Sequence, residues 1–456
     1  MKNFLFFCSF MICFNTAIGA GVDIKRETQN GIEFVWIKDN QFPTYNISVY
    51  FADGASSDYA SRAGETQMMF SLLDSGTHRY SKAQITDILE FYGVSYGATV
   101  VHEFSNFGIS GLVKDALPTL KMVCHLFKDS TFPKNEVKRY TKKATSRIKN
   151  LVISPSSIAD RAFRNVNLSG SQFSLLAEGG LKTISRIRQK NLANKLEYFN
   201  SKVKKRIYFS GPEEIWNLRS VFLNDCGWSG KAANYVRSFS DESLKVKDSK
   251  PEIVLVTIPK ANQAQIRWGS YLPRESVNKN VEQADLFTKV LGSGFSSLLM
   301  SELRHKRGLI YSARAVVAGQ KYYGRSQILT STRNEKLLET LNVIREILKN
   351  LKEKGLGAKE FDFSKGALAG RYHFQFEKKS TFLQKVLFYD HLGKSIDEIY
   401  EYPKRVNQLN VESIQQGAFK YFPELGTDIV IVGSRSLKKE LQKFGRVKVV
   451  NYTRFL

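Results

Sequence analysis

Two distant stretches of the chain share one alternation of apolar and polar positions. Ile, Val and Phe occupy every second position over residues 47–51, and Ala, Ile and Trp do the same over residues 264–268. A period of two is typical of a β-strand that buries one face. We therefore predict two half-buried strands at equivalent places in a repeated unit.

Further signals recur with a similar offset, as expected for a duplicated module. A Tyr-Phe pair precedes an apolar strand that ends at Gly211, and a second Tyr-Phe pair precedes a strand that ends at Gly433, 222 residues later. The stretches 117–127 and 335–353 also correspond, because apolar residues follow helical spacing in both. In the second of these helices, Thr332 and Glu335 have the spacing of a capping box, and Gly355 stands where the helix should end.

The chain is therefore predicted to be α+β, with two homologous modules that each pack helices on a mainly antiparallel sheet. The first module covers residues 24–240 and the second covers residues 252–456. Residues 241–251 between them are polar and end in proline, which is typical of a linker.

Residues 1–20 have the pattern of a secretory signal peptide. Lys2 precedes an apolar run over residues 4–14, and small residues follow it up to residue 20. A membrane anchor is the alternative, but the apolar run is too short to span a bilayer. We expect an exported chain, periplasmic or secreted, without a transmembrane segment.

The charge balance narrows the class of partner. The chain has 68 Lys and Arg against 43 Asp and Glu, a formal net charge of +25. Such an excess favours nucleic acid, an anionic membrane or an acidic partner, but no nucleic-acid motif is present and exported proteins rarely meet nucleic acid. The densest basic run, residues 138–149, is interpreted as the solvated face of a helix, with a partner protein or an anionic surface as the functional alternative.

Two cysteines, Cys124 and Cys226, follow the first 20 residues. Cys124 precedes His125, but it lies on an apolar helical face, so we expect a buried structural thiol and no metal ligand. An exported protein can form a disulfide, and the sequence leaves open whether these two cysteines pair. His102 and Glu103 are expected on a strand, where they would point to opposite faces.

The order of these motifs is similar to that of the pitrilysin/insulinase zinc peptidases, in their short bacterial and mitochondrial-processing-peptidase-like branch. The family frame G-x-A-H-x-x-E-H-x-x-x-x-G-T corresponds to GETQMMFSLLDSGT at residues 64–77, and the frame continues to Gly111. The frame L-G-x-G-x-x-S-x-L-x-x-x-x-R-x-x-x-G-L-x-Y of the second module corresponds to LGSGFSSLLMSELRHKRGLIY at residues 291–311. The resemblance covers nearly all of the chain after residue 20.

The resemblance places the zinc ligands of the first module at positions that hold other residues here. Gln67 stands at the first His, Phe70 at the Glu that acts as general base, and Ser71 at the second His. The third ligand of the family is a Glu, and no acid stands at its place near Arg147 and Ile148. Gln and Ser are poor zinc ligands and Phe cannot move a proton, so we expect no metal in this chain.

The second module keeps the residues that reach across to the zinc site in the family. By resemblance, Tyr311 would donate a hydrogen bond to the scissile carbonyl oxygen, and Arg304 would hold the substrate backbone. An ion-paired surface Arg304 and a core Tyr311 are the structural alternative. Three further residues would line the peptide channel in the substrate-binding loop, since no Lys-Ser/Thr follows to make it a phosphate loop; these are Gly292, Gly294 and Ser296.

The resemblance implies that this chain is the non-zinc subunit of an exported heterodimeric metallopeptidase and is inactive alone. A homologous zinc-bearing subunit would supply the metal, its ligands and the base, and the pair would enclose an unfolded peptide. Two alternatives stay open. One is a structural protein of the same fold, as in the respiratory-complex core subunits of the family, and the other is a peptide-binding module that offers a sheet edge without cleavage.

Overall fold

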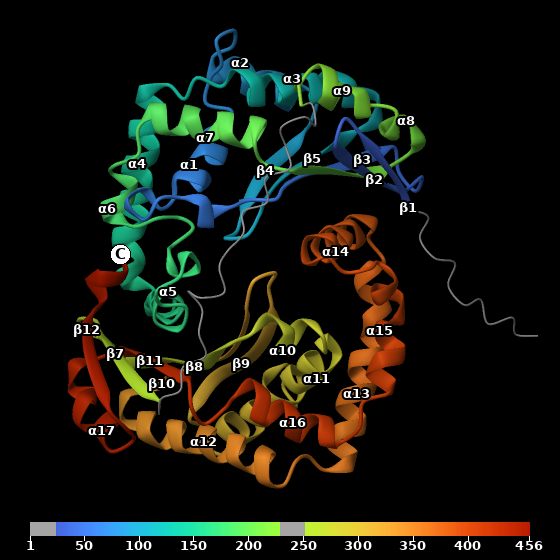
Figure 1. Ribbon diagram of the computed structural model, residues 1–456. Helices are drawn as coiled ribbons and strands as arrows, with labels where there is room; N and C mark the ends of the chain where they lie inside the picture. The colour runs from blue at the N-terminus through green and yellow to red at the C-terminus, as the bar shows by residue number, and fades with distance from the viewer. Residues whose placement is uncertain (1–23, 229–250) are drawn as a thin grey trace, which may run out of the picture.

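The computed structural model describes residues 24–228 and 251–456 (Figure 1). The expected signal peptide at 1–20 and nearly all of the expected linker at 241–251 lie outside these residues. Each described half contains one six-stranded sheet with helices packed against it. The α+β prediction with two homologous modules is therefore confirmed.

The two sheets have corresponding strand orders, β1-β2-β6-β3-β5-β4 and β12-β7-β11-β8-β10-β9. The β2–β6 pair is parallel in the first sheet, as are the two pairs of β7 in the second, and the other described pairs are antiparallel. The strands of the first sheet are β1 Ile24–Gln29, β2 Ile32–Lys38, β3 Thr44–Phe51, β4 Ser95–Val100, β5 Ser105–Leu112 and β6 Lys205–Gly211. Those of the second are β7 Glu252–Thr257, β8 Gln263–Leu272, β9 Ile310–Gly319, β10 Gly324–Arg333, β11 Thr427–Gly433 and β12 Val447–Asn451.

The helices follow the same repetition. The long helix α3 after the β4–β5 hairpin corresponds to α12 after the β9–β10 hairpin, and the next helix α4 corresponds to α13. The helices of the first module are α1 Glu65–Ser71, α2 Lys82–Phe91, α3 Ala116–Asp129, α4 Lys134–Lys149, α5 Pro155–Asn167, α6 Leu181–Ile184, α7 Gln189–Ser201, α8 Glu213–Trp216 and α9 Arg219–Asn224. Those of the second are α10 Arg274–Asn278, α11 Val281–Gly292, α12 Leu337–Glu353, α13 Ala358–Tyr372, α14 Lys379–Leu392, α15 Asp397–Asn407, α16 Glu412–Tyr421 and α17 Lys438–Gln442.

The start of α12 differs from the predicted capping box. Thr332 belongs to β10 and lies five residues before the first residue of the helix, so it is not the N-cap; its hydroxyl donates to the carbonyl of Leu309 at 2.7 Å. The helix begins at Leu337 without a side-chain cap. The predicted end is confirmed, because Gly355 has a φ of +70° directly after the last helical turn, a conformation that glycine adopts without strain.

Each sheet has one face covered by a helix of the other module (Figure 1). Helix α5 of the first module packs on β8 and β11, and helix α14 of the second module packs on β6. Two apolar clusters form where these helices meet the sheets. One contains Phe163 of α5 with Val430 of β11, and the other contains Tyr208 of β6 with Val386 of α14. The two modules are therefore interlocked through reciprocal helix–sheet contacts.

This interlocking corrects the prediction of half-buried strands. Tyr50 on β3 is 3% exposed, although it faces away from the core that contains Val49. Arg267 on β8 is 2% exposed, and its guanidinium donates to Asp160 of α5 at 2.6 Å. The polar positions of the alternation are thus buried under helices that come from distant parts of the sequence.

His102 and Glu103 lie in a bend between β4 and β5, where the sequence predicted a strand. The Glu103 carboxylate accepts hydrogen bonds from the backbone N–H groups of Lys321 and Tyr322 at 3.0 and 3.1 Å. His391 of α14 contacts the same carboxylate at 2.9 Å. Glu103 therefore joins the first sheet to both α14 and the β9–β10 hairpin of the second module.

The neighbouring His102 has a different partner: its Nε2 lies 2.8 Å from the carbonyl oxygen of Leu175. Burial and the guanidinium groups of Arg164 and Arg325 lower the pKa of His102 from 6.5 to about 4. The folded protein therefore holds this imidazole neutral at a pH where the unfolded chain would bind a proton.

We expect the free energy of unfolding to fall by about 3 kcal/mol through His102 as the pH drops from 6.5 to 4, because only the unfolded state takes up the proton in that range. His102→Gln keeps a donor for Leu175 and does not titrate. Urea denaturation of both proteins across this range should show the difference between wild type and variant shrinking towards acid pH. A difference that does not change with pH would contradict this role of His102.

Cys124 and Cys226 form a disulfide, which answers the question of pairing that the sequence left open, and Cys124 is fully buried. The bond joins α3 to the segment after α9 and closes a loop of 102 residues, which removes about 4–5 kcal/mol of chain entropy from the unfolded state. His125 beside it contacts Asp129 at 2.8 Å and Thr77 at 3.2 Å. These contacts give His125 a structural role.

Candidate functional site

Helix α1, which carries the positions of the missing zinc ligands, is held at its N-terminus by the buried carboxylate of a residue that precedes the helix in the sequence. Asp58 accepts hydrogen bonds from the backbone N–H groups of Gly64 and Thr66 at 2.9 and 3.1 Å and from the Thr66 hydroxyl at 2.6 Å. Lys195 of α7 lies 3.2 Å from the same carboxylate. Asp58 therefore caps the N-terminus of α1, a position where the helix dipole favours negative charge.

Gln67 and Ser71 lie one turn apart on the more open side of α1, as two ligands of one metal would. The Gln67 amide donates to the Ser71 hydroxyl at 3.1 Å, and that hydroxyl donates to the backbone carbonyl of Gln67 at 2.8 Å. The two side chains thus satisfy each other and the helix. Neither supplies the imidazole nitrogen or carboxylate that zinc requires.

Phe70, at the position of the general base, is only 4% exposed and points into the core of the first module. Its ring centroid lies 5.3 Å from that of Phe199, 5.6 Å from that of Phe51 and 6.4 Å from that of Phe127. At the third ligand position, Arg147 is exposed and Ile148 is buried. Within residues 24–228 and 251–456, no group of three His, Cys, Asp or Glu side chains could hold a metal ion.

The glycine loop of the second module begins where α11 meets β9. A Cβ atom at Gly292 would lie 2.4 Å from the backbone nitrogen of Ala315, so only glycine permits this approach of helix and strand. Gly294 has a φ of +93°, and its carbonyl accepts the Ser297 hydroxyl at 2.8 Å. Ser296, between Gly294 and Ser297, lies in the exposed part of the loop. The two glycines are thus explained by backbone geometry.

Arg304 lies in a π-helical segment, Met300–His305, that follows the loop; such segments are often found at functional sites. Its guanidinium carbon lies 5.0 Å from the ring centroid of Tyr311 and 5.6 Å from that of Phe295. The neighbouring carboxylate, Glu302, pairs with Lys306 and Arg307. Among the residues that the structure describes, Arg304 has no ion pair, which argues against an ordinary ion-paired surface residue.

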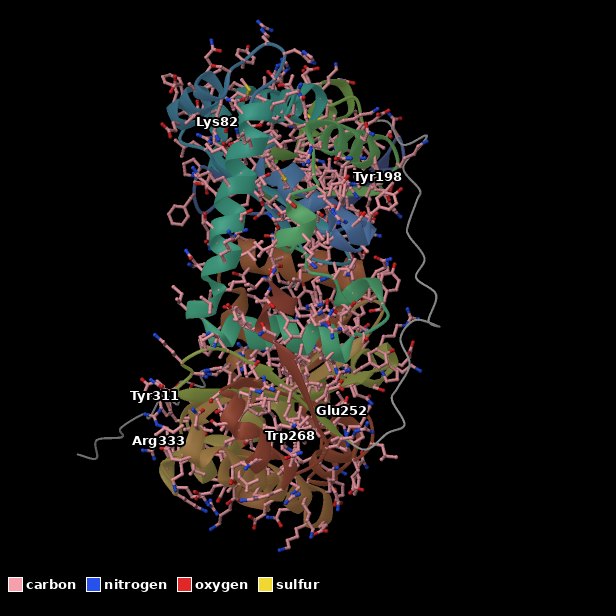
Figure 2. All side chains as sticks on the ribbon, turned by 90° about the vertical axis from the view of Figure 1, so that its left-hand side faces the viewer. Lys82, Tyr198, Glu252, Trp268, Tyr311 and Arg333 are labelled. Atoms are coloured by element: carbon pink, nitrogen blue, oxygen red, sulfur yellow. A yellow bond between two sulfur atoms is a disulfide. The ribbon has the colours of Figure 1, made fainter. Side chains whose placement is uncertain are left out.

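Tyr311 is 80% exposed and does not fill a core. It lies near the start of β9, where the register with β10 shifts between Thr330 and Thr332. A β-bulge of this kind changes the direction of a side chain and is common beside active sites. Figure 2 shows Tyr311 at the margin of the second module, on the side of Arg333 and opposite Glu252.

Among the described residues, Arg304 is therefore not ion-paired and Tyr311 does not fill a core. Phe295, 70% exposed, adds a second aromatic ring near the Arg304 guanidinium. Sequence reasoning missed Phe295, and the available signal was its place between Gly294 and Ser296 in the loop. An exposed Tyr hydroxyl beside a guanidinium can donate hydrogen bonds to a carbonyl oxygen that gains charge.

The structure does not bring the two sets of residues together within one chain. Gln67 and Ser71 belong to the first module and Arg304 and Tyr311 to the second, and no hydrogen bond or ion pair between the described residues joins them. The strands β4 and β9 form edges of their sheets. An edge strand such as β4 offers backbone groups that a further strand could use, whereas on β9 the N–H groups of Ala313 and Val317 already donate to Met300 and Thr288.

A polar cavity of about 450 Å³ lies beside edge strand β4, between β3, β5 and the start of α14. Ser48, Asn106 and Gln384 line it, with Gln384 donating to the Ser48 hydroxyl at 2.9 Å. The side-chain amide oxygen of Asn106 (Oδ1) is buried without a hydrogen-bond partner among the described atoms. The open end of the first sheet thus presents small polar side chains.

Comparisons with known proteins place this geometry in a family context. Residues 227–368 match the family described as "Peptidase M16 inactive domain". A protein of Bacillus subtilis named "Uncharacterized zinc protease YmxG" is 22% identical over 88% of this chain and 96% of its own length. A protein of Helicobacter pylori named "Non-peptidase homolog YmxG" is 19% identical over 86% of this chain and 88% of its own length.

Solved structures share the fold over the same extent. The structure titled as a peptidase M16 inactive domain from Pseudomonas fluorescens has a TM-score of 0.79 at 18% identity and covers 91% of this chain and 98% of its own. A protein described as a protease from Helicobacter pylori has a TM-score of 0.76 at 15% identity and covers 90% of this chain and 99% of its own. The resemblance to the pitrilysin/insulinase peptidases is thereby confirmed, and it is a resemblance to their inactive M16 branch.

Proposed function

Starting from this resemblance to the inactive M16 branch, we propose that the chain is the non-zinc subunit of a heterodimeric metallopeptidase. A homologous zinc-bearing chain supplies the metal, its ligands and the general base. This chain supplies Arg304 and Tyr311 to the partner's site, where the Tyr hydroxyl stabilises the developing oxyanion and the Arg holds the peptide backbone.

The observation that carries this proposal is the combination of a lost and a kept site. Gln67, Phe70 and Ser71 cannot bind zinc or move a proton. Tyr311 is exposed and the half-buried Arg304 lies beside it, and no ion pair or side-chain hydrogen bond among the described residues holds either of them. A chain that served only as a scaffold would have no need for an exposed Tyr beside an Arg without an ion pair.

A peptide-binding role without cleavage is the second candidate. The polar cavity beside β4 and the free edge of that strand favour it, because an extended peptide can add to a sheet edge through main-chain hydrogen bonds. The two candidates share the bound peptide and differ in whether the partner carries zinc. A structural subunit of the same fold remains the third possibility, and it requires neither peptide nor metal.

The disulfide supports the further proposal that the protein is exported to the periplasm or secreted. Disulfides such as Cys124–Cys226 persist in oxidising compartments. Among the described residues, no helix is long and apolar enough to cross a membrane.

We expect the purified chain to bind no stoichiometric zinc and to cleave no peptide, and a homologous chain with an intact H-x-x-E-H motif to restore both in a stable complex. Pull-down from the native cells, followed by elemental analysis and a peptide cleavage assay, tests this. One tightly held zinc per isolated chain would reject the proposal. Recovery of a complex that holds no zinc would favour the structural or peptide-binding role.

A further inference from the structure

A continuous basic surface covers α4 and the segment around α6, which pack against each other. Figure 1 places both helices on one side of the molecule, and Figure 2 shows that side with α4 running along it. We name this surface the α4–α6 basic face. Its exposed cations are Lys134, Lys138, Arg139, Lys142, Lys143, Arg147 and Lys149 from α4, and Lys182, Arg186, Arg188 and Lys190 from the segment around α6.

The cations of α4 repeat at helical spacing and not at random. Residues 134, 138 and 142 form one row and residues 139, 143 and 147 form a second, while Val137, Ala144 and Ile148 bury the opposite side. Like charges four residues apart destabilise a helix. The arrangement therefore opposes the local stability of α4 and calls for a reason outside the helix.

The acidic residues of this region leave the face unneutralised. Between residues 134 and 190 the sequence contains Glu136, Asp160 and Glu178. Asp160 pairs with Arg267 and Glu178 with the buried Arg161. Glu136 is shared by Lys82 and Arg139. Among the described residues, the other ten cations of the face have no ion pair.

The repeated module provides an internal comparison. Helix α13 occupies in the second module the place that α4 occupies in the first, and its exposed side contains Phe363, Gly366 and Gly370 with charges of both signs. The fold therefore does not require a basic helix at this place. The charge of α4 is a property of the first module alone.

An exposed apolar residue lies at the end of the face. The short 3₁₀ helix Asn150–Ile153 follows α4 directly, and the Ile153 side chain is 82% exposed. Cations spread along a surface together with an exposed apolar side chain are typical of proteins that lie on an anionic bilayer.

We propose that the α4–α6 basic face docks the protein on a bilayer that contains anionic lipids. A bilayer fits this face better than an acidic protein does, because the cations extend along the whole of α4, about 24 Å at the rise of an α-helix, and around α6, without a pocket. Each cation near such a surface adds a favourable contribution, and the sum depends on salt. Docking uses residues other than Arg304 and Tyr311, so it does not depend on the proposed peptidase role.

The test is co-sedimentation of the full chain with vesicles of phosphatidylcholine alone and of phosphatidylcholine with about 30% phosphatidylglycerol, at about 0.05 and 0.3 M salt. We expect binding to the anionic vesicles at low salt that is about tenfold or more tighter than to the neutral ones, and that high salt abolishes. The variant K134Q/K138Q/K142Q/K143Q should lose about tenfold or more of this binding. Ile153→Ser should lose a smaller part.

The matched control removes four exposed, unpaired lysines from the second module: K354Q/K359Q/K438Q/K439Q. It has the same net charge as the α4 variant and should bind like wild type. All proteins carry the same first 20 residues, so any contribution of that segment is equal and is measured on the neutral vesicles. Equal losses in both quadruple variants, or no preference for anionic vesicles, would overturn the proposal. So would capture of wild type by polyglutamate beads without vesicle binding, which would indicate an acidic protein partner.

Discussion

Tyr311→Phe is expected to lower the turnover of the reconstituted subunit pair by about 10²–10³-fold, roughly 3–4 kcal/mol of barrier. The substitution removes one hydroxyl and leaves the ring, so the contact between the ring and the Arg304 guanidinium at 5.0 Å is kept. Because Tyr311 is 80% exposed, the loss cannot act through a disturbed core. KM should change much less than kcat, since the hydrogen bond strengthens mainly in the transition state.

Steady-state kinetics on the pair, with zinc content and complex size measured alongside, provides the readout. Tyr59→Phe is the matched control, because Tyr59 is also exposed and has the guanidinium of Arg62 over its ring at 4.7 Å. Arg304→Ala should raise KM and lower kcat together, as a residue that holds the peptide before and during the reaction must. Near wild-type turnover of an intact, zinc-loaded Tyr311→Phe pair would make this chain a scaffold.

Phe70→Ala is expected to cost about 3–5 kcal/mol of unfolding free energy, the usual cost of emptying a large buried aromatic site. The ring packs between three other phenylalanines and is 4% exposed. Gln67→Ala and Ser71→Ala, on the same helix but towards solvent, should each change stability by no more than about 0.5–1 kcal/mol. These two variants are the control for any general effect of substituting in α1.

Urea denaturation followed by tryptophan fluorescence can measure these differences, because Trp228 lies 5.2 Å from the ring of Phe127 in the same aromatic cluster. Phe70→Glu would restore the residue type of a general base, but it would bury an unpaired carboxylate, so we expect loss of folding and no gain of activity. A Phe70→Ala protein within about 1 kcal/mol of wild type would show that α1 is not retained for the core.

Packing in the first module explains why α1 is present although it lacks metal ligands. The position of the general base now supplies a core side chain, and the two ligand positions satisfy each other by hydrogen bonds. The helix therefore contributes to the stability of the first module, while the exposed chemistry of the chain lies in the second.

The duplicated architecture, and the chemistry that each copy lacks or keeps, could be predicted from residue patterns alone. Strand ends at Gly211 and Gly433, the helix that ends before Gly355, and the loss of ligands at Gln67 and Ser71 can all be read locally, because periodicity and residue type fix which side of an element is apolar and which groups could bind a metal. The local pattern fails at Thr332, because its spacing to Glu335 predicts a helix cap whereas the residue belongs to strand β10.

What covers the second face of each sheet, and which distant residues meet, depends on the packing of elements that are far apart in the chain. Tyr50 is buried in a cluster with residues of α14, where its hydroxyl lies 2.9 Å from Nδ1 of His391, 341 residues later, and Cys124 forms a disulfide across 102 residues. The contacts of Arg304 with Phe295 and Tyr311 require a glycine loop, a π-helical segment and a shifted register to converge. Local patterns carry no information on such contacts, because the free energy that selects them is gained only when separate elements exclude water together.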